Sequence, residues 1–176
     1  MKRSLIGKLG SMNGETVRIC GWLETLRNQK HVQFLVIRDH SGRVQTVHEK
    51  KMNPELVALI DSLTLESVVE ITGKVVLNQI VKLGGLEVMI ESVAVVNKAD
   101  SPLPLDDKST LEMRLDWRFL DLRTPQNLLI FKVQTAIEQA MRAFWESEGF
   151  IEIHSPKFMG NASESGAELF EVKYFD

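Results

Sequence analysis

The chain has 176 residues, of which 44% are hydrophobic and 26% charged, proportions typical of a globular protein that buries a core. It contains no apolar run of about 18 residues and no signal-peptide pattern near Met1, so we expect neither a membrane span nor a leader and assign it to the cytoplasm. The single cysteine, Cys20, excludes an internal disulfide, and the four histidines lack zinc-site spacing, so no bound metal is expected.

The net charge of −3 is distributed unevenly along the chain. Residues 1–104 carry 13 Lys or Arg and 11 Asp or Glu, a net charge of +2, whereas residues 105–176 carry 8 and 13, a net charge of −5. The first part is therefore the better electrostatic partner for phosphate groups, although a charge of +2 is small.

The first part of the chain alternates between apolar and polar residues in five segments, which predicts strands with one buried face. Between the third and fourth segments, Asn53-Pro54-Glu55 predicts the start of a helix, with Asn at the cap and Pro at the first helical position. This order is that of a mainly β OB-fold barrel, and another small barrel or sandwich is the alternative. The expected strands are 15–24, 33–37, 43–48, 67–77 and 86–96, and the expected helix is 53–63.

A domain boundary is expected at residues 101–107, where two prolines force extended backbone and the sign of the charge changes. We therefore expect a first domain over residues 1–104 and a hinge over residues 105–124. An incomplete domain of mixed α and β structure is expected over residues 125–176.

The start of that second domain carries clear signals for a helix followed by a strand. Thr124 and Pro125 predict a helix start, apolar residues recur at three- and four-residue steps after them, and Gly149 predicts the helix end. Residues Phe150–His154 alternate like a strand, and Pro156 predicts its end.

A barrel that binds nucleic acid needs an exposed aromatic ring for stacking, polar side chains for base edges and cations for phosphates. Phe34 shares a strand face with Val36, whereas Leu35 and Ile37 can fill the interior, which favours an exposed ring. The alternative is that the ring lies in the core and the polar candidates are solvated strand residues, which is the commoner outcome for such residues considered alone. The candidate base-binding residues are Arg27, Phe34, Gln45 and Glu87.

Longer stretches of the sequence resemble one family of enzymes. The run from Met113 to Arg123 sets three arginines and two aspartates among apolar residues, and Gly149 to Pro156 resembles the first class II signature. The whole chain resembles the N-terminal portion of aspartyl-tRNA synthetases, class IIb enzymes, of the archaeal and eukaryotic-like type. The asparaginyl and lysyl relatives share this plan, but the wording of residues 114–125 is closest to the aspartyl enzymes. The other matching stretches are 21–22, 34–39, 42–45, 102–105 and 168–170.

In that family the OB-fold barrel binds the tRNA anticodon, so the resemblance implies a role for each candidate residue. Phe34 corresponds to the aromatic residue that stacks on the middle anticodon base. Gln45 and Glu87 correspond to polar residues that read neighbouring bases, and Arg27 corresponds to a basic residue on the same surface. The implied partner is tRNA(Asp), with tRNA(Asn) as a further candidate.

Residues 125–176 correspond to the beginning of the class II catalytic domain. Pro156 corresponds to the proline of the first signature, a region that forms much of the subunit contact, which implies a homodimer for the complete protein. Glu164, in the loop 161–168, corresponds to a glutamate near the α-amino group of bound aspartate, where a carboxylate pairs with an ammonium.

The implied activity is that of an aspartate–tRNA ligase, which uses ATP and Mg²⁺ to form aspartyl-adenylate and then transfers aspartate to tRNA. The second and third class II signatures, which supply the cations that hold ATP, would lie after Asp176. We therefore expect no catalytic residue and no bound cofactor in this fragment, and expect it to be inactive alone. The alternatives are a stand-alone, non-catalytic OB-fold module that binds tRNA or other RNA, and an asparaginyl- or lysyl-tRNA synthetase relative.

Overall fold

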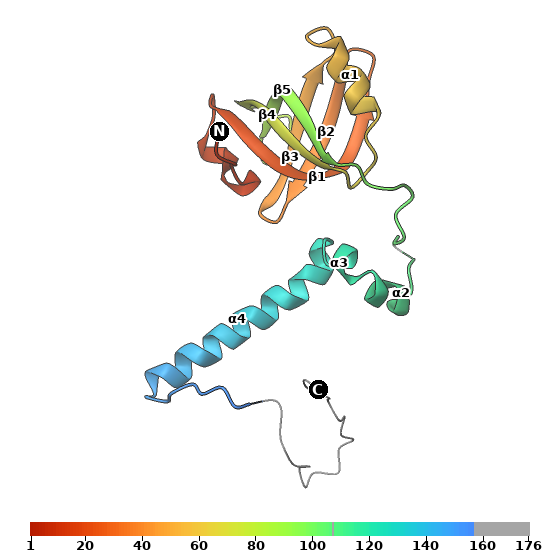
Figure 1. The fold of residues 1–176 in the computed structure, drawn as a ribbon. Coiled ribbons are helices and arrows are strands. Elements are labelled where there is room, and N and C mark those ends of the chain that lie inside the picture. Colours follow the sequence, from red (N-terminus) through yellow and green to blue (C-terminus); the bar gives the residue numbers. More distant parts are fainter. Residues whose placement is uncertain (107, 157–176) are drawn as a thin grey trace, which may run out of the picture. The chain divides into compact units, whose positions relative to one another are not determined.

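The computed structural model describes residues 1–106 and 108–156, and the chain divides into two compact units (Figure 1). Unit 1 is Met1–Pro104, and unit 2 begins at Leu105. Unit 1 is built mainly of strands, and the described part of unit 2 is built of helices.

Unit 1 is a closed barrel of five strands in the order β1-β2-β3-β5-β4. Neighbouring strands pair antiparallel except β3 and β5, which pair in parallel. This architecture confirms the predicted OB-fold, including the helix between the third and fourth strands. The elements are β1 (Thr16–Asn28), β2 (Val32–Asp39), β3 (Gly42–Glu49), α1 (Pro54–Asp61), β4 (Val68–Leu77) and β5 (Leu86–Asn97).

The alternation in the sequence becomes an alternation between the barrel interior and its outer face. Leu35 and Ile37 of β2 are fully buried, whereas Phe34 and Arg38 are only half-buried. Burying a Leu or Ile side chain completely contributes about 1.5–3 kcal/mol. The interior is therefore filled by one face of every strand, with Ile19, Leu23, Val44, Val69, Ile71, Val75 and Val88 among the core residues.

Strand β1 continues beyond its predicted end at Glu24. A register irregularity between Leu23 and Thr25 interrupts its pairing with β2, and beyond it the strand resumes. Arg27, which we expected before the second strand rather than within the first, is therefore a strand residue paired with Phe34.

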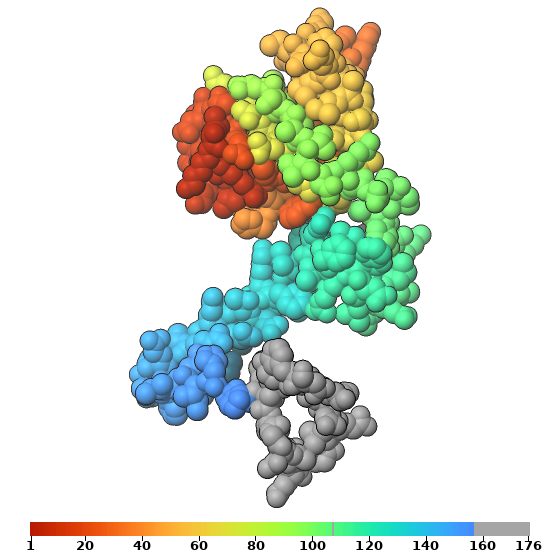
Figure 2. Space-filling model, in the orientation of Figure 1, coloured from red at the N-terminus to blue at the C-terminus, as the bar shows by residue number. Residues whose placement is uncertain are grey.

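A short 3-10 helix, η1 (Ile6–Ser11), precedes β1 and was not predicted from the sequence; Figure 2 shows these N-terminal residues in red on the surface of unit 1. Ile6 is buried in the core, and its backbone N–H donates to Asp39 Oδ2 at 3.1 Å. Burial by itself raises the pKa of the Asp39 carboxyl, but hydrogen bonds from Ser41 and from backbone N–H groups outweigh it, so the pKa is lowered. One carboxylate thus ties the N-terminal segment to the turn between β2 and β3.

Helix α1 begins as predicted from its capping residue. Asn53 Oδ1 accepts hydrogen bonds from the backbone N–H groups of Glu55 at 3.1 Å and Leu56 at 3.2 Å. Leu56 and Ile60 are buried in the core cluster, so α1 packs onto the barrel through its apolar stripe.

The residues expected as a hinge contain two short helices, α2 (Leu111–Asp116) and α3 (Arg118–Asp121). The Asp121 carboxylate accepts a hydrogen bond from Arg114 Nε at 2.8 Å and another from Asn127 Nδ2 at 2.7 Å. The hydrogen bond to Asp121 also raises the pKa of the Arg114 guanidinium. The arginine-rich run is therefore held to the start of the next helix by one acidic side chain.

Helix α4 (Pro125–Ser147) starts at the predicted proline and ends before Gly149, whose φ of +83° allows the chain to leave the helix. Thr124 lies at the N-cap position but forms no side-chain cap, because its hydroxyl donates to the Asp121 carbonyl at 2.8 Å instead. No helix among the described residues combines the length and apolar composition needed to cross a membrane.

The predicted strand at Phe150–His154 is wrong, because these residues form no regular secondary structure. A strand needs a neighbouring strand to complete its hydrogen-bond ladder, and no described residue of unit 2 forms one. The Phe150 ring packs edge-on against Trp145 with centroids 5.0 Å apart, but Ile151 and Ile153 are 86% and 83% exposed. The segment therefore exposes apolar surface.

Candidate nucleic-acid interface

Two rows of outward-facing residues cross the strands on the outer face of the barrel. Residues that pair directly in a sheet point to the same side, so strand register defines each row. The first row runs through Arg27, Phe34, Val47, Met89 and Lys74. The second row lies beside it and runs through Thr25, Val36, Gln45, Glu87 and Val76. All four candidates from the sequence lie in these two rows.

The ring of Phe34 lies on this outer face and is not part of the core cluster. The ring is half-buried. Its apolar neighbours Val36 and Val47 are only 9% and 6% exposed. The Arg27 guanidinium lies over the ring, 5.4 Å from its centroid, in a cation–π arrangement. The ring therefore lies between the outer face of the sheet and the Arg27 guanidinium.

The three polar candidates form a chain of hydrogen bonds across the barrel. Arg27 Nη2 donates to Gln45 Oε1 at 3.0 Å, and Gln45 Nε2 donates to Glu87 Oε2 at 3.1 Å. These contacts need the parallel pairing of β3 with β5, which sets Gln45 beside Glu87. Gln45 and Glu87 are therefore half-buried and hydrogen-bonded to other side chains, and are not simply solvated strand residues.

Sequence reasoning missed a fourth polar member of this network, Asn78. Its Nδ2 donates to the second oxygen of Glu87, Oε1, at 3.0 Å. The residue directly follows β4, where a lone Asn ordinarily predicts only a turn. Its connection to Glu87 could have been inferred only from the antiparallel pairing of Leu77 with Leu86.

Arg27 differs from the other arginines of unit 1 in its electrostatic environment. Each of the other four has a carboxylate oxygen within 4.0 Å; they are Arg3, Arg18, Arg38 and Arg43. Among the described residues no carboxylate forms an ion pair with Arg27, whose partners are a ring and an amide. Its positive charge is thus available to an anionic ligand at this face.

The barrel also holds one reactive thiol, that of Cys20. It is half-exposed, with Sγ 3.4 Å from Glu70 Oε2. Partial burial and the contact with Glu70 raise the pKa of this thiol, which disfavours the nucleophilic thiolate. Among residues 1–106 and 108–156, no cluster of His, Cys, Asp or Glu could hold a metal ion.

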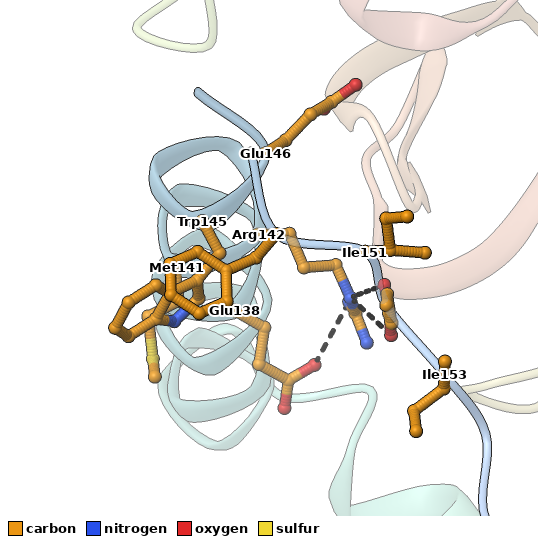
Figure 3. Close-up of a pocket in the computed structure, with 9 residues that line it drawn as sticks. Glu138, Met141, Arg142, Trp145, Glu146, Ile151 and Ile153 are labelled. Carbon is orange, nitrogen blue, oxygen red and sulfur yellow. Dashed lines mark hydrogen bonds and ion pairs between the residues drawn. The ribbon is translucent and has the colours of Figure 1, made fainter. Parts of the chain in front are cut away.

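Unit 2 contains a hollow of about 840 Å³ between α4 and residues 150–153, shown in Figure 3. Its one arginine is paired, since Arg142 Nε lies 3.2 Å from Glu152 Oε2, while apolar side chains such as Met141 and Trp145 form much of the lining. Pro156, at the end of the described segment, is exposed. Glu164 lies outside the described residues.

Two families match the two parts of the chain. Residues 17–96 match the family described as OB-fold nucleic acid binding domain. Residues 110–175 match the family described as tRNA synthetases class II (D, K and N). The first match includes all but one residue each of β1 and β5, the whole of the other three strands and both rows of the outer face.

Curated relatives are similar over nearly the whole chain. The aspartate–tRNA(Asp) ligase of Thermococcus kodakarensis is 44% identical over an alignment of 170 positions that covers 94% of this chain and 39% of that protein. The aspartate–tRNA(Asp) ligase of Thermoplasma volcanium is 43% identical over an alignment of 181 positions, gaps included, that covers 100% of this chain and 42% of that protein. The aspartate–tRNA(Asp/Asn) ligase of Archaeoglobus fulgidus is 39% identical over 94% of this chain and 39% of its own length. The chain spans about two fifths of the length of these relatives.

Solved structures show the same arrangement of elements. The asparaginyl-tRNA synthetase from Pyrococcus horikoshii complexed with asparaginyl-adenylate matches with a TM-score of 0.88 and 30% identity, over 99% of this chain and 41% of that one. The aspartyl tRNA synthetase from Entamoeba histolytica matches with a TM-score of 0.80 and 27% identity, over 94% of this chain and 41% of that one.

Proposed function

We propose that this chain, which belongs to the aspartate–tRNA ligase family of class II synthetases and spans the N-terminal part of its members, binds the anticodon loop of tRNA on the outer face of its barrel. The observation that carries the proposal is the placement of Phe34, Arg27, Gln45 and Glu87 in two adjacent rows on one face. Loop bases of RNA can be unstacked, laid on an aromatic ring and read along their exposed edges.

The side chains on this face supply the three kinds of group that bind a single strand of RNA: an aromatic ring, a cation and polar groups. The ring of Phe34 offers a stacking platform worth about 1–3 kcal/mol per base once the Arg27 guanidinium that lies over it moves aside. That guanidinium offers a cation, and Gln45 and Glu87 offer an amide and a carboxylate one row away. A face that combines these groups suits a single strand of RNA better than it suits a protein partner.

For the complete protein we propose aspartate–tRNA ligase activity, with tRNA(Asp) as the substrate. Class II synthetases generally use ATP and Mg²⁺, but the described residues contain no cluster that fits a metal ion, so no step of that reaction is assigned to them. The Archaeoglobus fulgidus relative is named for both tRNA(Asp) and tRNA(Asn), which makes tRNA(Asn) the second substrate to assay. Amino-acid-dependent ATP–pyrophosphate exchange by the full gene product tests this activity; a preference for asparagine or lysine over aspartate would contradict it.

We further propose that the complete protein is a homodimer in which α4 contributes to the contact. Helix α4 has no buried residue and exposes an apolar stripe, which soluble proteins ordinarily cover with a partner. The stripe consists of Leu129, Ile130, Val133, Ile137, Met141 and Phe144. Light scattering of the full gene product should give the dimer mass, and an Ile137→Lys variant should shift it to the monomer.

The binding proposal is tested on the 176-residue chain with a fluorescently labelled anticodon stem-loop of tRNA(Asp). Phe34→Leu keeps an apolar side chain but removes the aromatic face, and should weaken binding by about fivefold or more. Phe34→Tyr keeps the ring and should bind nearly as well as the parent chain. Circular dichroism melting controls for folding, and equal affinities of the two variants would contradict the stacking role.

A further inference from the structure

We propose that Asn78 is a positioning residue for the Glu87 carboxylate and that it couples the loop between β4 and β5 to the base-binding face. The inference rests on the proposed anticodon-binding function. It assigns to Asn78 an effect that passes through Glu87, whose second oxygen it holds at 3.0 Å.

Asn78 directs its side-chain amide and its backbone groups to the protein itself. The side-chain Nδ2 donates to Glu87 Oε1, and the side-chain Oδ1 accepts from the Ile80 backbone N–H at 3.2 Å. Its own N–H donates to the Gly85 carbonyl at 2.9 Å, and its carbonyl accepts from the Val81 N–H at 2.9 Å. One residue therefore pins both ends of the loop and one oxygen of the carboxylate.

The direction of the side-chain amide is fixed by chemistry as well as by geometry. A backbone N–H can only donate, so the atom of Asn78 that faces Ile80 must be the oxygen. The NH₂ group must then face Glu87, which accepts it. If the loop moved away from the barrel, the donor would move with it.

Glu87 is held from two sides by neutral amides. Gln45 Nε2 donates to Oε2, and Asn78 Nδ2 donates to Oε1. A carboxylate has about four acceptor positions, so each oxygen keeps capacity for an N–H of a bound base. The two amides thus fix the plane of the carboxylate without using up its ability to accept from RNA.

The loop that Asn78 pins is well placed to meet RNA. In OB-folds the loop between the fourth and fifth strands takes part in oligonucleotide binding. Here Ile80, near its start, is 90% exposed, so the loop presents side chains to solvent. Contact of RNA with this loop and reading of a base by Glu87 would therefore reinforce each other through Asn78.

The test compares two substitutions of one residue, measured with the labelled anticodon stem-loop of tRNA(Asp). Asn78→Ala removes the donor and should weaken binding by about threefold to tenfold. Asn78→Asp keeps the oxygen that accepts from Ile80 but turns a carboxylate toward Glu87, and should weaken binding more, by over about tenfold near pH 8.

Asn13→Ala is the matched control, because Asn13 Oδ1 accepts from the backbone N–H of Leu77, the residue before Asn78, at 3.2 Å without contacting Glu87. It should lower the melting temperature slightly and leave RNA affinity unchanged. In a Glu87→Ala background the Asn78 substitutions should lose most of their effect, because that effect passes mainly through the carboxylate.

The outcomes separate this inference from the proposed function. If the parent chain does not bind the stem-loop, the anticodon-binding proposal itself fails. If it binds and Glu87→Ala weakens binding, but the Asn78 variants have no effect or add fully to Glu87→Ala, only the positioning role is overturned.

Discussion

The two units of the chain differ in how much of their apolar surface is buried. Unit 1 closes a sheet on itself, so every strand has two neighbours and one buried face. Unit 2 has no buried residue in any of its described helices and exposes a continuous stripe along α4. The difference shows that the barrel covers its own apolar side chains, whereas the described helices of unit 2 leave theirs exposed.

The largest difference between the units should appear when an apolar side chain is shortened. Leu35→Ala in the barrel creates a cavity and should cost about 2–5 kcal/mol of unfolding free energy. Ile137→Ala on α4 removes an exposed side chain and should cost less than about 0.5 kcal/mol in a monomer. Urea unfolding followed by circular dichroism measures both. Similar losses at the two positions would mean that α4 is covered in solution.

An intermediate effect is expected at Asp39, whose carboxylate ties η1 to the turn between β2 and β3. Asp39→Asn removes the ionised acceptor of the η1 tie and should cost about 1–3 kcal/mol. Because the folded-state pKa of Asp39 is lowered, its stabilisation is present above the ordinary pKa of an aspartate and is lost as the pH falls through the folded-state value. Acid unfolding curves check this, since the Asn variant should lose less stability than the parent chain below about pH 4.

The smallest expected effects on stability concern the residues that precede α1 in unit 1 and α4 in unit 2. Asn53 caps α1 with two hydrogen bonds, so Asn53→Ala should cost about 1 kcal/mol. Thr124 precedes α4 without a side-chain cap, so Thr124→Ala should cost less than about 0.5 kcal/mol. Thermal melting of the two variants provides the measurement. A larger loss for Thr124→Ala would show that its bond to the Asp121 carbonyl matters more than a cap.

The barrel could be predicted from the sequence because each strand carries a local signal. Alternation exposes one face of every strand, and the Asn53 cap marks the helix between them. The helix η1 and the end of β1 near Arg27 escaped prediction, since both depend on contacts with distant residues. Local patterns also misled at Phe150–His154, where alternation was present but no neighbouring strand was available.

The sequence pointed to four residues of the candidate interface but not to the hydrogen bonds that connect them. The residue types and the resemblance to a family pointed to Arg27, Phe34, Gln45 and Glu87. Their hydrogen bonds depend on strand register, which a single sequence does not specify until the barrel is closed. Asn78 escaped for the same reason, because its partner lies across β4 and β5.

The parallel seam between β3 and β5 has a consequence for how this surface fails. Gln45 and Glu87 are 42 positions apart in the chain and meet only at that seam. A fluctuation that parts the two strands would disrupt the candidate interface while leaving each hairpin largely intact. The proposed binding of RNA therefore requires the closed ring of strands as a whole, and heating should abolish it before most of the secondary structure melts.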